Sequence, residues 1–548
     1  MRYWISIVLI AVVAAAFCQV GISFAGVKAH IVRFPTDRSM GMLYVLDANK
    51  VDTSSYDDWE PLCEATGDVT VPAGKVLRLD LQNDAGEDLS PLSALKPNDL
   101  QMLFCYGVEI LDEQLKHVSH LTDLQELYLR DTGILGTGLK YLAGLNSLKR
   151  LRVDSTHVGD NELAYLSNLP SLNSLNIWMT PTSDVGMVHI EKITSLKDLV
   201  LSRGVGDEGL SHLKHLTSLR HLSAWSQSIS DEGLAHLTNM TQMESLDLRD
   251  TQISDEGLAH LKQMKKLRTL VLYDTRVTEE GLVHLVELKN LEHLSLPFDV
   301  GDAGLMHLSQ LPSLKRVDID GDSVTEKGLA KLTEMKSLDS VSVGGEDNTD
   351  EIVSKLAVLP GLRSLSLGRG LTDQGLVRLK GIKSMQSLTL NRSNITGEAM
   401  MVLAELPFLR ELRILDMNLS GEEYWKSLGK LPSLDRLSLG LIRSKVTDAN
   451  ISHLSGLQSL KDLSILSVVV KDKNHVAAMD VTDKGLMHIS KLKALERLSL
   501  TGAKITDEGL QQLSIIPGLK WLDLQGCGVT EQGLQLLKKK LPALHWYL

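Results

Sequence analysis

Long basic runs are absent from this 548-residue sequence, and none exceeds Lys538–Lys540. Acidic residues outnumber basic ones by 69 to 57, so the formal net charge is −12. Nucleic acid is densely negative, and this charge balance argues against nucleic acid as a partner. Aromatic residues make up only 4% of the chain, which favours a core filled with leucine.

Recognisable catalytic motifs are also absent. The sequence has no phosphate-cradling glycine loop, no H-E-x-x-H pair, no nucleophile elbow and no Cys/His pair at a familiar spacing. The glycines of Gly204–Gly206 lack the strand, loop and helix context of a nucleotide site. We therefore expect no enzymatic activity, no catalytic residues and no cofactor.

The N-terminal segment decides the expected compartment. The run from Trp4 to Gly26 carries no charged residue, and Ser23 and Ala25 are small residues at both positions that a signal peptidase reads. Residues 1–25 are therefore predicted to be a cleaved signal peptide or, since the run approaches the ~20 residues that span a bilayer, an uncleaved N-terminal anchor. Contact with a membrane is expected only through such an anchor. The predicted location is exported: secreted, periplasmic or at the cell surface.

One pattern fills most of the remaining chain. The stretch Leu246–Thr269 has two leucines that alternate on a strand, then a polar turn, then apolar residues at helical spacing. One such unit cannot bury its apolar side alone, so it must stack on copies of itself. Most copies are 23 or 24 residues apart. With Leu246, their first strand residues are Leu103, Leu127, Leu151, Leu175, Leu199, Leu222, Leu270, Leu294, Val317, Val341, Leu365, Leu388, Leu412, Leu437, Leu463, Leu498 and Leu522.

Polar positions of the unit have predicted structural roles. Ser254 is placed to cap the helix, and Asp255 and Glu256 bring negative charge to its N-terminus. The hydroxyl of Thr251 is placed to bond turn backbone that would otherwise be buried without a partner.

The units, L-x-x-L-x-L followed by SDEGL or TDEGL, resemble leucine-rich repeats and are most similar to those of large exported bacterial proteins. The resemblance covers roughly four fifths of the chain. It implies an α/β solenoid of about 18 repeats, with a curved parallel β-sheet on the concave side, short helices on the convex side, and usually a binding role. F-box adaptors carry a similar repeat with Cys in the turn. Here only Cys527 holds that position, so an intracellular adaptor in protein turnover is the least favoured function.

The segments around the repeats have their own predicted roles. Residues 26–75 lack the repeat but contain strand-like stretches at Met42–Leu46 and Asp68–Pro72. Because a solenoid end exposes its core, we predict that they form an N-terminal cap. Residues 76–548 are predicted to form the solenoid and a C-terminal cap, with a loop insertion at 468–480. Such an insertion is either a binding edge or a tolerated surface loop.

Cleavage of the signal would leave three cysteines, which cannot all pair internally. Cys63 lies just before the repeats, and Cys105 lies on the first regular strand. A disulfide between them would fasten the cap in an oxidising compartment, and two buried free thiols are the alternative.

Side chains that flank the inward leucines face the concave side, one, three and four residues after the first strand leucine. Aromatic and arginine residues gather there. Trp178 and Trp225 lie two strands apart, an expected separation of about 10 Å. Such residues suit a contact with protein or sugar, and the alternative is that the rings only pack against concave neighbours. The candidate ligand-binding residues are Tyr128, Arg130, Trp178, Arg203, Trp225, Arg249, Tyr273 and Phe298.

Acidic residues follow on the next repeats. Alternate carboxylates at Asp318, Asp320 and Asp322 would point to one side, and hard cations prefer several such oxygens. The stretch lacks the downstream glutamate of a calcium loop, so no metal site is assigned. A docking patch for a basic partner and a solvated acidic face are the alternatives.

The sequence thus predicts an exported, non-catalytic binding protein whose concave face takes a protein or polysaccharide partner. The second hypothesis is a structural component of the envelope or cell surface that self-associates.

Overall fold

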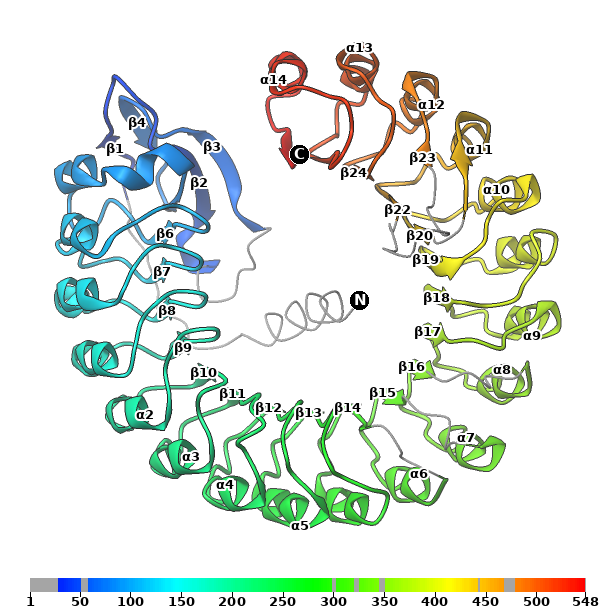
Figure 1. Cartoon of the computed structure of the whole chain (residues 1–548), viewed down its shortest axis with the longest axis horizontal. Coiled ribbons are helices and arrows are strands. Elements are labelled where there is room, and N and C mark those ends of the chain that lie inside the picture. Colours follow the sequence, from blue (N-terminus) through cyan, green and yellow to red (C-terminus); the bar gives the residue numbers. More distant parts are fainter. Residues whose placement is uncertain are drawn as a thin grey trace, which may run out of the picture. The chain divides into compact units, whose positions relative to one another are not determined.

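The structure is a computed structural model that describes residues 28–50, 58–297, 302–319, 325–343, 350–441, 444–467 and 479–547. The chain divides into two compact units. Unit 1 is Met1–Val277 with Glu287–Leu291, and unit 2 is Thr278–Val286 with Glu292–Leu548. In each unit the strands lie on the concave side and the helices on the convex side (Figure 1).

The segment before the repeats forms two small antiparallel arrangements. β1 (His30–Arg33) pairs with β4 (Asp68–Val71), and β2 (Gly41–Asp47) lies between β3 (Glu60–Glu64) and β5 (Lys75–Leu81). The strands expected in this segment are therefore confirmed as β2 and β4. The other edge of β5 begins the parallel sheet, so this strand connects the first residues to the repeats.

A buried arginine fixes that connection. Arg78 on β5 is fully buried, and its Nε donates to Asp80 Oδ1 at 2.5 Å. Its guanidinium carbon lies 4.6 Å from the ring centre of Tyr44, 5.9 Å from that of Trp59 and 5.4 Å from that of Phe104. A buried charge is tolerated when it is paired and surrounded in this way. The contacts tie residues of β2, β5 and the first repeat into one core.

From β5 onward, neighbouring strands of unit 1 pair in parallel. The register places Leu79 opposite Leu103 and continues through the predicted leucines to Leu270. The predicted strand positions are therefore confirmed. The strands are β6 (Met102–Phe104), β7 (Glu126–Tyr128), β8 (Arg150–Arg152), β9 (Ser174–Asn176), β10 (Asp198–Val200), β11 (His221–Ser223), β12 (Ser245–Asp247) and β13 (Thr269–Val271).

The convex elements of unit 1 are short helices, many of them 3₁₀ helices. Their apolar residues, such as Leu258 and Leu261, are fully buried against the strand leucines. In chain order after η1 (Ala48–Lys50) they are η3 (Asn83–Glu87), η4 (Ser90–Ala94), η5 (Asp112–Val118), η6 (Thr137–Gly144), η7 (Asn161–Asn168), α2 (Asp184–Ile190), α3 (Asp207–Leu213), α4 (Asp231–Ala235), α5 (Asp255–Leu258) and η8 (Ala259–Gln263). The residues of η9 (Gly281–Glu287) are divided between the two units.

Unit 2 repeats the same arrangement. Its register runs from Leu294 opposite Val317 to Leu522 opposite Trp546. The strands of its parallel sheet are β14 (His293–Ser295), β15 (Arg316–Ile319), β16 (Ser340–Val343), β17 (Ser364–Leu367), β18 (Ser387–Asn391), β19 (Glu411–Met417), β20 (Arg436–Leu441), β22 (Asp462–Ser467), β24 (Arg497–Leu500), β25 (Trp521–Asp523) and β26 (His545–Tyr547). Its helices are α6 (Asp302–Leu308), α7 (Glu326–Leu332), α8 (Asp350–Leu356), α9 (Asp373–Arg378), η10 (Leu379–Gly381), η11 (Ala399–Glu405), α10 (Glu422–Leu428), α11 (Asp448–Leu454), α12 (Asp483–Ile489), α13 (Asp507–Leu510), η12 (Gln511–Ile515) and α14 (Glu531–Lys540).

The predicted insertion at 468–480 lies outside the described residues except for its last two. These two residues form β23 (Met479–Asp480), which pairs in parallel with β21 (Val446–Thr447). The carboxylate of Asp480 contacts Lys504 at 2.5 Å and Lys445 at 2.9 Å. Hydrogen bonds from these two ammonium groups lower the pKa of Asp480 to about 2. The end of the insertion is thus held to the turns on either side of it.

Carboxylates at the start of the convex helices join consecutive repeats. Asp231 accepts hydrogen bonds from the backbone N–H and the hydroxyl of Ser254 in the next repeat, at 2.8 and 2.5 Å. The same double contact recurs in both units, from Ser183 to Asp160, Ser230 to Asp207, Thr325 to Asp302, Thr372 to Asp350, Thr396 to Asp373, Thr482 to Asp448, Thr506 to Asp483 and Thr530 to Asp507. We call these contacts the aspartate staples.

The staple explains the glycine of the SDEGL motif. At Gly257, an added Cβ would lie 3.0 Å from the Ile253 side chain and closer still to the Asp231 carboxylate. A larger residue would displace the acceptor from Ser254, so the close stacking of repeats requires glycine here.

Two predicted polar roles have different outcomes. The hydroxyl of Thr251 donates to the carbonyl of Leu248 at 2.7 Å, so its role in the turn is confirmed. Ser254 stands at the N-cap position of α5, but its side chain accepts no hydrogen bond from that helix. Ser254 therefore holds the predicted N-cap position without a capping hydrogen bond, and its hydroxyl donates to Asp231 of the preceding repeat.

The predicted disulfide is also wrong. Cys63 is an exposed free thiol and Cys105 a buried one. Cys63 lies on β3 and Cys105 just beyond β6, with β2 and β5 between them. Three strand spacings amount to about 14 Å, which exceeds the Cα separation that a disulfide spans. Burial raises the pKa of the Cys105 thiol.

In the ranges described above, no helix combines the length and the apolar character needed to cross a bilayer.

The aspartate staples predict a specific loss of stability. Asp231→Ala removes the acceptor of two hydrogen bonds and is expected to lower the free energy of unfolding by about 2 kcal/mol. Glu232→Ala is the matched control, because it removes a carboxylate from the same helix start and is expected to cost less than about 0.5 kcal/mol. Urea unfolding followed by circular dichroism gives both values. Equal losses in the two variants would show that the staple adds nothing beyond helix-end charge.

Candidate functional site

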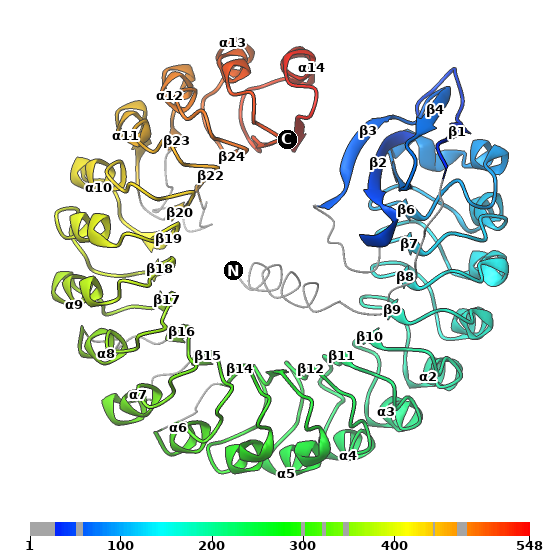
Figure 2. The same ribbon diagram turned by 180° about the vertical axis from the view of Figure 1, so that it is seen from behind.

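The concave face of unit 1 carries most of the predicted site residues. Each residue three positions after the first strand leucine stands beside its equivalent on the next strand, since the strands pair in register. Seen from behind, β6 to β12 follow one another along this face (Figure 2). We call this row the aromatic-arginine column; it consists of Tyr106, Arg130, Asp154, Trp178, Ser202, Trp225, Arg249 and Tyr273.

The two tryptophans of the column are in direct contact. The ring centres of Trp178 and Trp225 lie 5.8 Å apart, with an interplanar angle of 67°. The expected separation of about 10 Å was therefore too large. The reason is Ser202 on the strand between them, which is small, buried, and donates its hydroxyl to the Thr180 carbonyl at 2.5 Å. It leaves the space in which the indoles meet edge to face.

An arginine is held over one of these rings. The guanidinium carbon of Arg249 lies 4.5 Å from the ring centre of Trp225. Asp247 fixes this arginine, because its two carboxylate oxygens accept from Nε at 3.0 Å and from Nη2 at 2.6 Å. Arg249 is consequently only 15% exposed. Arg203 has a different environment, being 67% exposed and 3.7 Å from Asp250.

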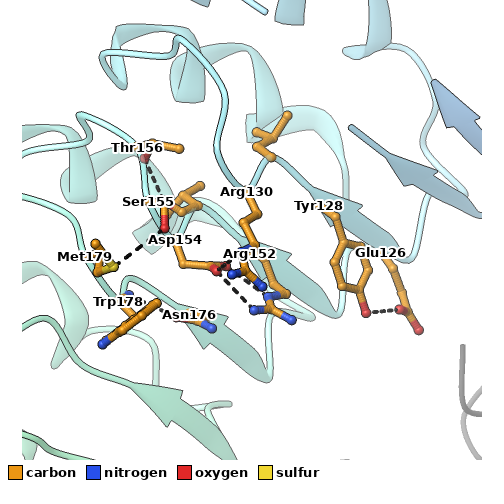
Figure 3. A network of polar contacts seen from close by, with 12 residues as sticks. Glu126, Tyr128, Arg130, Arg152, Asp154, Ser155, Thr156, Asn176, Trp178 and Met179 are labelled. Atoms are coloured by element: carbon orange, nitrogen blue, oxygen red, sulfur yellow. Dashed lines mark hydrogen bonds and ion pairs between the residues drawn. The ribbon is translucent and has the colours of Figure 1, made fainter. Parts of the chain in front are cut away.

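Another arginine pair lies further along the same face (Figure 3). Asp154 is 1% exposed and accepts from Arg152 Nε at 2.9 Å and from Nη2 at 3.1 Å. Arg130 Nε lies 3.2 Å from Asp154 Oδ2, the oxygen that also accepts from Arg152 Nη2. The guanidinium carbon of Arg130 also lies 5.1 Å from the ring centre of Tyr106. One buried carboxylate therefore orients two arginines.

Tyr128 is more enclosed than its predicted role required. Its hydroxyl donates to Glu126 at 2.8 Å, and Glu126 also accepts from Arg150 at 2.5 Å. Its ring lies 5.1 Å from that of Phe104. Burial and then the charge of Glu126 raise the pKa of Tyr128. Tyr128 therefore supports the face and offers little surface to a ligand.

The indole N–H groups of the tryptophan pair lack hydrogen-bond partners. Both Trp178 Nε1 and Trp225 Nε1 are shielded from solvent, and neither finds an acceptor among the residues that the structure describes. A shielded donor without a partner costs about 1–3 kcal/mol. The pair is therefore not arranged for maximum stability of the free chain.

Met179, next to Trp178, is held in an unfavourable backbone conformation. Its φ is +54°, in the left-handed region that favours Gly, Asn and Asp. The same turn position in other repeats of unit 1 is occupied by Asp131, Ser155, Asp250 and Asp274, all with positive φ. Met179 is nevertheless apolar and 57% exposed. A strained, exposed apolar side chain beside the tryptophans makes this position a candidate for function.

A hollow of about 580 Å³ lies at the turn edge of the sheet. Met179 and Arg203 line it, and each directly follows a member of the column in the sequence. Its other lining residues are Thr156, His157, Thr180, Pro181, Thr182, Ser183, Ser202 and Gly204. The exposed surface of the site thus extends from the column to this edge.

The remaining predicted residues are less informative. Tyr273 is half-buried at the end of the column, and Phe298 lies outside the described residues. Asp318 is on β15, whereas Asp320 and Asp322 fall outside the described ranges. Across the described part of the chain, no three His, Cys, Asp or Glu side chains gather as a metal site would require. The cation site is therefore only a prediction from sequence.

The repeats now define the family. A family model described as "Leucine Rich repeat" matches residues 239–261 and 492–514, one segment in each unit. The first segment contains the SDEGL motif and the second contains TDEGL. The strand register shows that the same unit repeats along the sheet of each unit. The chain is a leucine-rich-repeat protein. Its solenoid fold is the one that the sequence predicts.

Comparison with curated proteins finds no match. Among solved structures, an internalin from Listeria monocytogenes is 18% identical with a TM-score of 0.29, over 75% of this chain and 93% of the internalin chain. A leucine-rich-repeat protein from Leptospira interrogans is 16% identical with a TM-score of 0.36, over 80% and 100% of the two chains. A plant receptor kinase ectodomain from Arabidopsis thaliana is 15% identical with a TM-score of 0.35, over 90% and 61%. These values identify no partner for this leucine-rich-repeat protein.

Several residues of the site were not found from sequence. Arg152 and Met179 stand one and four positions after a strand leucine, so the column rule itself could have included them. Glu126 and Arg150 precede the strand leucines, at a position that the rule omitted, yet they pair on the same face. The small residue Ser202 gave no signal, because its effect is to leave space for others.

The strain at Met179 predicts a gain in stability on substitution. Met179→Asn introduces a residue that tolerates positive φ. The substitution is expected to raise the free energy of unfolding by about 0.5–1 kcal/mol. Gly502→Ala is the matched control at the same turn position: its φ is +72° and an added Cβ would meet no atom within 4 Å. It is expected to cost about 1 kcal/mol through backbone conformation alone. Denaturant unfolding measures both, and a destabilised Met179→Asn variant would contradict the assignment of strain.

Proposed function

We propose that this leucine-rich-repeat protein is exported and binds a protein partner through the aromatic-arginine column and the adjoining turn edge of unit 1. The observation that carries the proposal is the contact between Trp178 and Trp225 on a solvent-facing sheet surface, with both indole N–H groups left without acceptors. The tryptophans are half-buried in the free chain, so part of each ring is available to a partner.

Energetics support a binding role over a structural one. The core of the repeat is complete without these side chains, because the leucines behind the sheet are fully buried. The strain at Met179 and the unpaired indole donors both lower stability. Tryptophan, tyrosine and arginine are the residues enriched where protein interfaces concentrate their binding energy. Their combination here fits a site retained for contact with a partner.

The ring geometry favours protein over polysaccharide. A sugar stacks on an open aromatic face, but Arg249 covers one face of Trp225 and Trp178 meets that ring edge to face. The pair therefore offers an irregular apolar surface beside charged groups, as protein interfaces do. Arg203 adds an exposed guanidinium to its rim.

Export is supported by the uncharged run from Trp4 to Gly26 and the small residues at Ser23 and Ala25. We expect the N-terminal peptide of the protein from its native host to begin at Gly26. Mass spectrometry of that peptide, with cell fractionation, checks the cleavage and the compartment. A full-length chain in the cytosolic fraction would contradict export.

The binding proposal predicts which substitutions abolish capture of a partner. Immobilised protein is incubated with envelope extract, and captured proteins are quantified by mass spectrometry. Trp178→Ala combined with Trp225→Ala is expected to reduce recovery at least about 30-fold, since a hot-spot residue contributes about 2 kcal/mol or more. Trp521→Ala is the matched control, because Trp521 is an exposed tryptophan on the strand face of unit 2. Thermal unfolding confirms that each variant is folded.

The outcomes separate the competing functions. Equal recovery by the wild type and the double variant contradicts the site. A captured partner that survives protease treatment and is sensitive to glycosidase would be a polysaccharide. Concentration-dependent assembly of the protein in size-exclusion chromatography would instead favour the self-associating structural component.

A further inference from the structure

We propose that Arg130 and Arg152, held by the buried carboxylate of Asp154, form a docking site for an acidic side chain of the protein partner. The inference deepens the proposed function and rests on it. It assigns a chemical group of the partner to one part of the aromatic-arginine column, one strand away from Trp178.

The charge balance of the cluster is the first argument. Two guanidinium groups share one carboxylate, which leaves a net charge of +1. Glu126 does not compensate it, because this side chain is engaged by Arg150 and by the Tyr128 hydroxyl. The exposed Asp131 forms no ion pair with either guanidinium in the part of the chain that the structure describes. The cluster therefore attracts an added negative charge.

The hydrogen-bond donors are the second argument. Arginine has five N–H donors in a planar fork that matches a carboxylate. Asp154 accepts from Nε and Nη2 of Arg152, and within the described residues the N–H groups on Nη1 of Arg152 and on both Nη atoms of Arg130 make no hydrogen bond. The side chains are 31% and 38% exposed, so these donors are within reach of a partner. Figure 3 shows both guanidinium groups converging on the same carboxylate.

Preorganisation is the third argument. Asp154 is buried and cannot turn away from its arginines, and the Tyr106 and Tyr128 rings lie 5.1 and 5.8 Å from the guanidinium carbons of Arg130 and Arg152. Arginines that are fixed before binding lose less conformational entropy when a carboxylate arrives. Tyr106 is 52% exposed and provides apolar surface beside the charge. The site thus fits an Asp or Glu that lies near an apolar residue able to reach Trp178.

A displayed library of random peptides provides the probe. Peptides that bind the wild-type protein, but not the Trp178→Ala/Trp225→Ala double variant, are synthesised in three forms. One is the free acid, one has an amidated C-terminus, and one has its acidic side chains replaced by amides. Fluorescence anisotropy then gives their affinities for Arg130→Gln, Asp154→Asn and the control Arg413→Gln. Arg413 is an arginine on the strand face of unit 2 that is paired with Glu411.

The two site variants are expected to act in opposite directions. Arg130→Gln weakens binding of the free-acid peptide about 10-fold, since it removes a charge-assisted hydrogen bond. Asp154→Asn tightens binding a few-fold, because the amide keeps an acceptor oxygen that orients the arginines but loses the negative charge that competes with the ligand. Arg413→Gln changes nothing. Replacing the acidic side chains by amides weakens binding to the wild type, whereas amidation of the C-terminus does not.

Each other outcome overturns the inference. One such outcome is a peptide that requires the two tryptophans yet binds Arg130→Gln as tightly as the wild type. That result excludes the carboxylate site and leaves the proposed function intact. Sensitivity to amidation of the C-terminus alone assigns the site to a chain terminus instead of a side chain. If no peptide depends on the tryptophans, both the proposed function and this inference fail. Arg130 is partly exposed, so its substitution remains interpretable even where Asp154→Asn does not fold.

Discussion

The aspartate staples are the interaction on which the rest of this leucine-rich-repeat structure depends. Each carboxylate, such as Asp231, receives a backbone N–H and a hydroxyl from the next repeat, and the glycine of the same motif lets the two turns approach. This spacing on the convex side brings the strands on the other side into register. Within each unit the buried leucines then form a continuous column behind the sheet, since each repeat covers the apolar side of its neighbour.

Because the staples and leucines carry the fold, the concave positions are free to differ from repeat to repeat. The two units use this freedom differently. Unit 1 places tryptophan, tyrosine and arginine side by side, as in the contact between Trp178 and Trp225. At the equivalent place in unit 2, three residues after the first strand leucine, several side chains are small or absent, as at Gly368, Asn391 and Gly440. The difference in chemistry, on the same scaffold, concentrates the candidate site in unit 1.

Within that site, arginines have two roles that differ by their partners. Arg249 is bound by Asp247 and covers the Trp225 ring, so it shapes the surface. Arg130 and Arg152 share a single carboxylate and keep donors for a ligand. Counting the carboxylates around each guanidinium therefore distinguishes arginines that build the face from those that are free to bind. Nearby, the strained backbone of Met179 exposes an apolar side chain to the same surface.

The sequence alone determined the solenoid and its register, because the leucine spacing leaves one way to bury the apolar side of every repeat. It also determined which side chains share the concave face, since strand residues alternate. The tertiary structure decided what those side chains do to one another. Trp178 meets Trp225 because Ser202 leaves room, and Cys63 stays apart from Cys105 because two strands intervene. Ser254 donates to a neighbouring repeat and makes no capping hydrogen bond to its own helix. Such contacts depend on positions across strands and turns, which spacing along one chain does not specify.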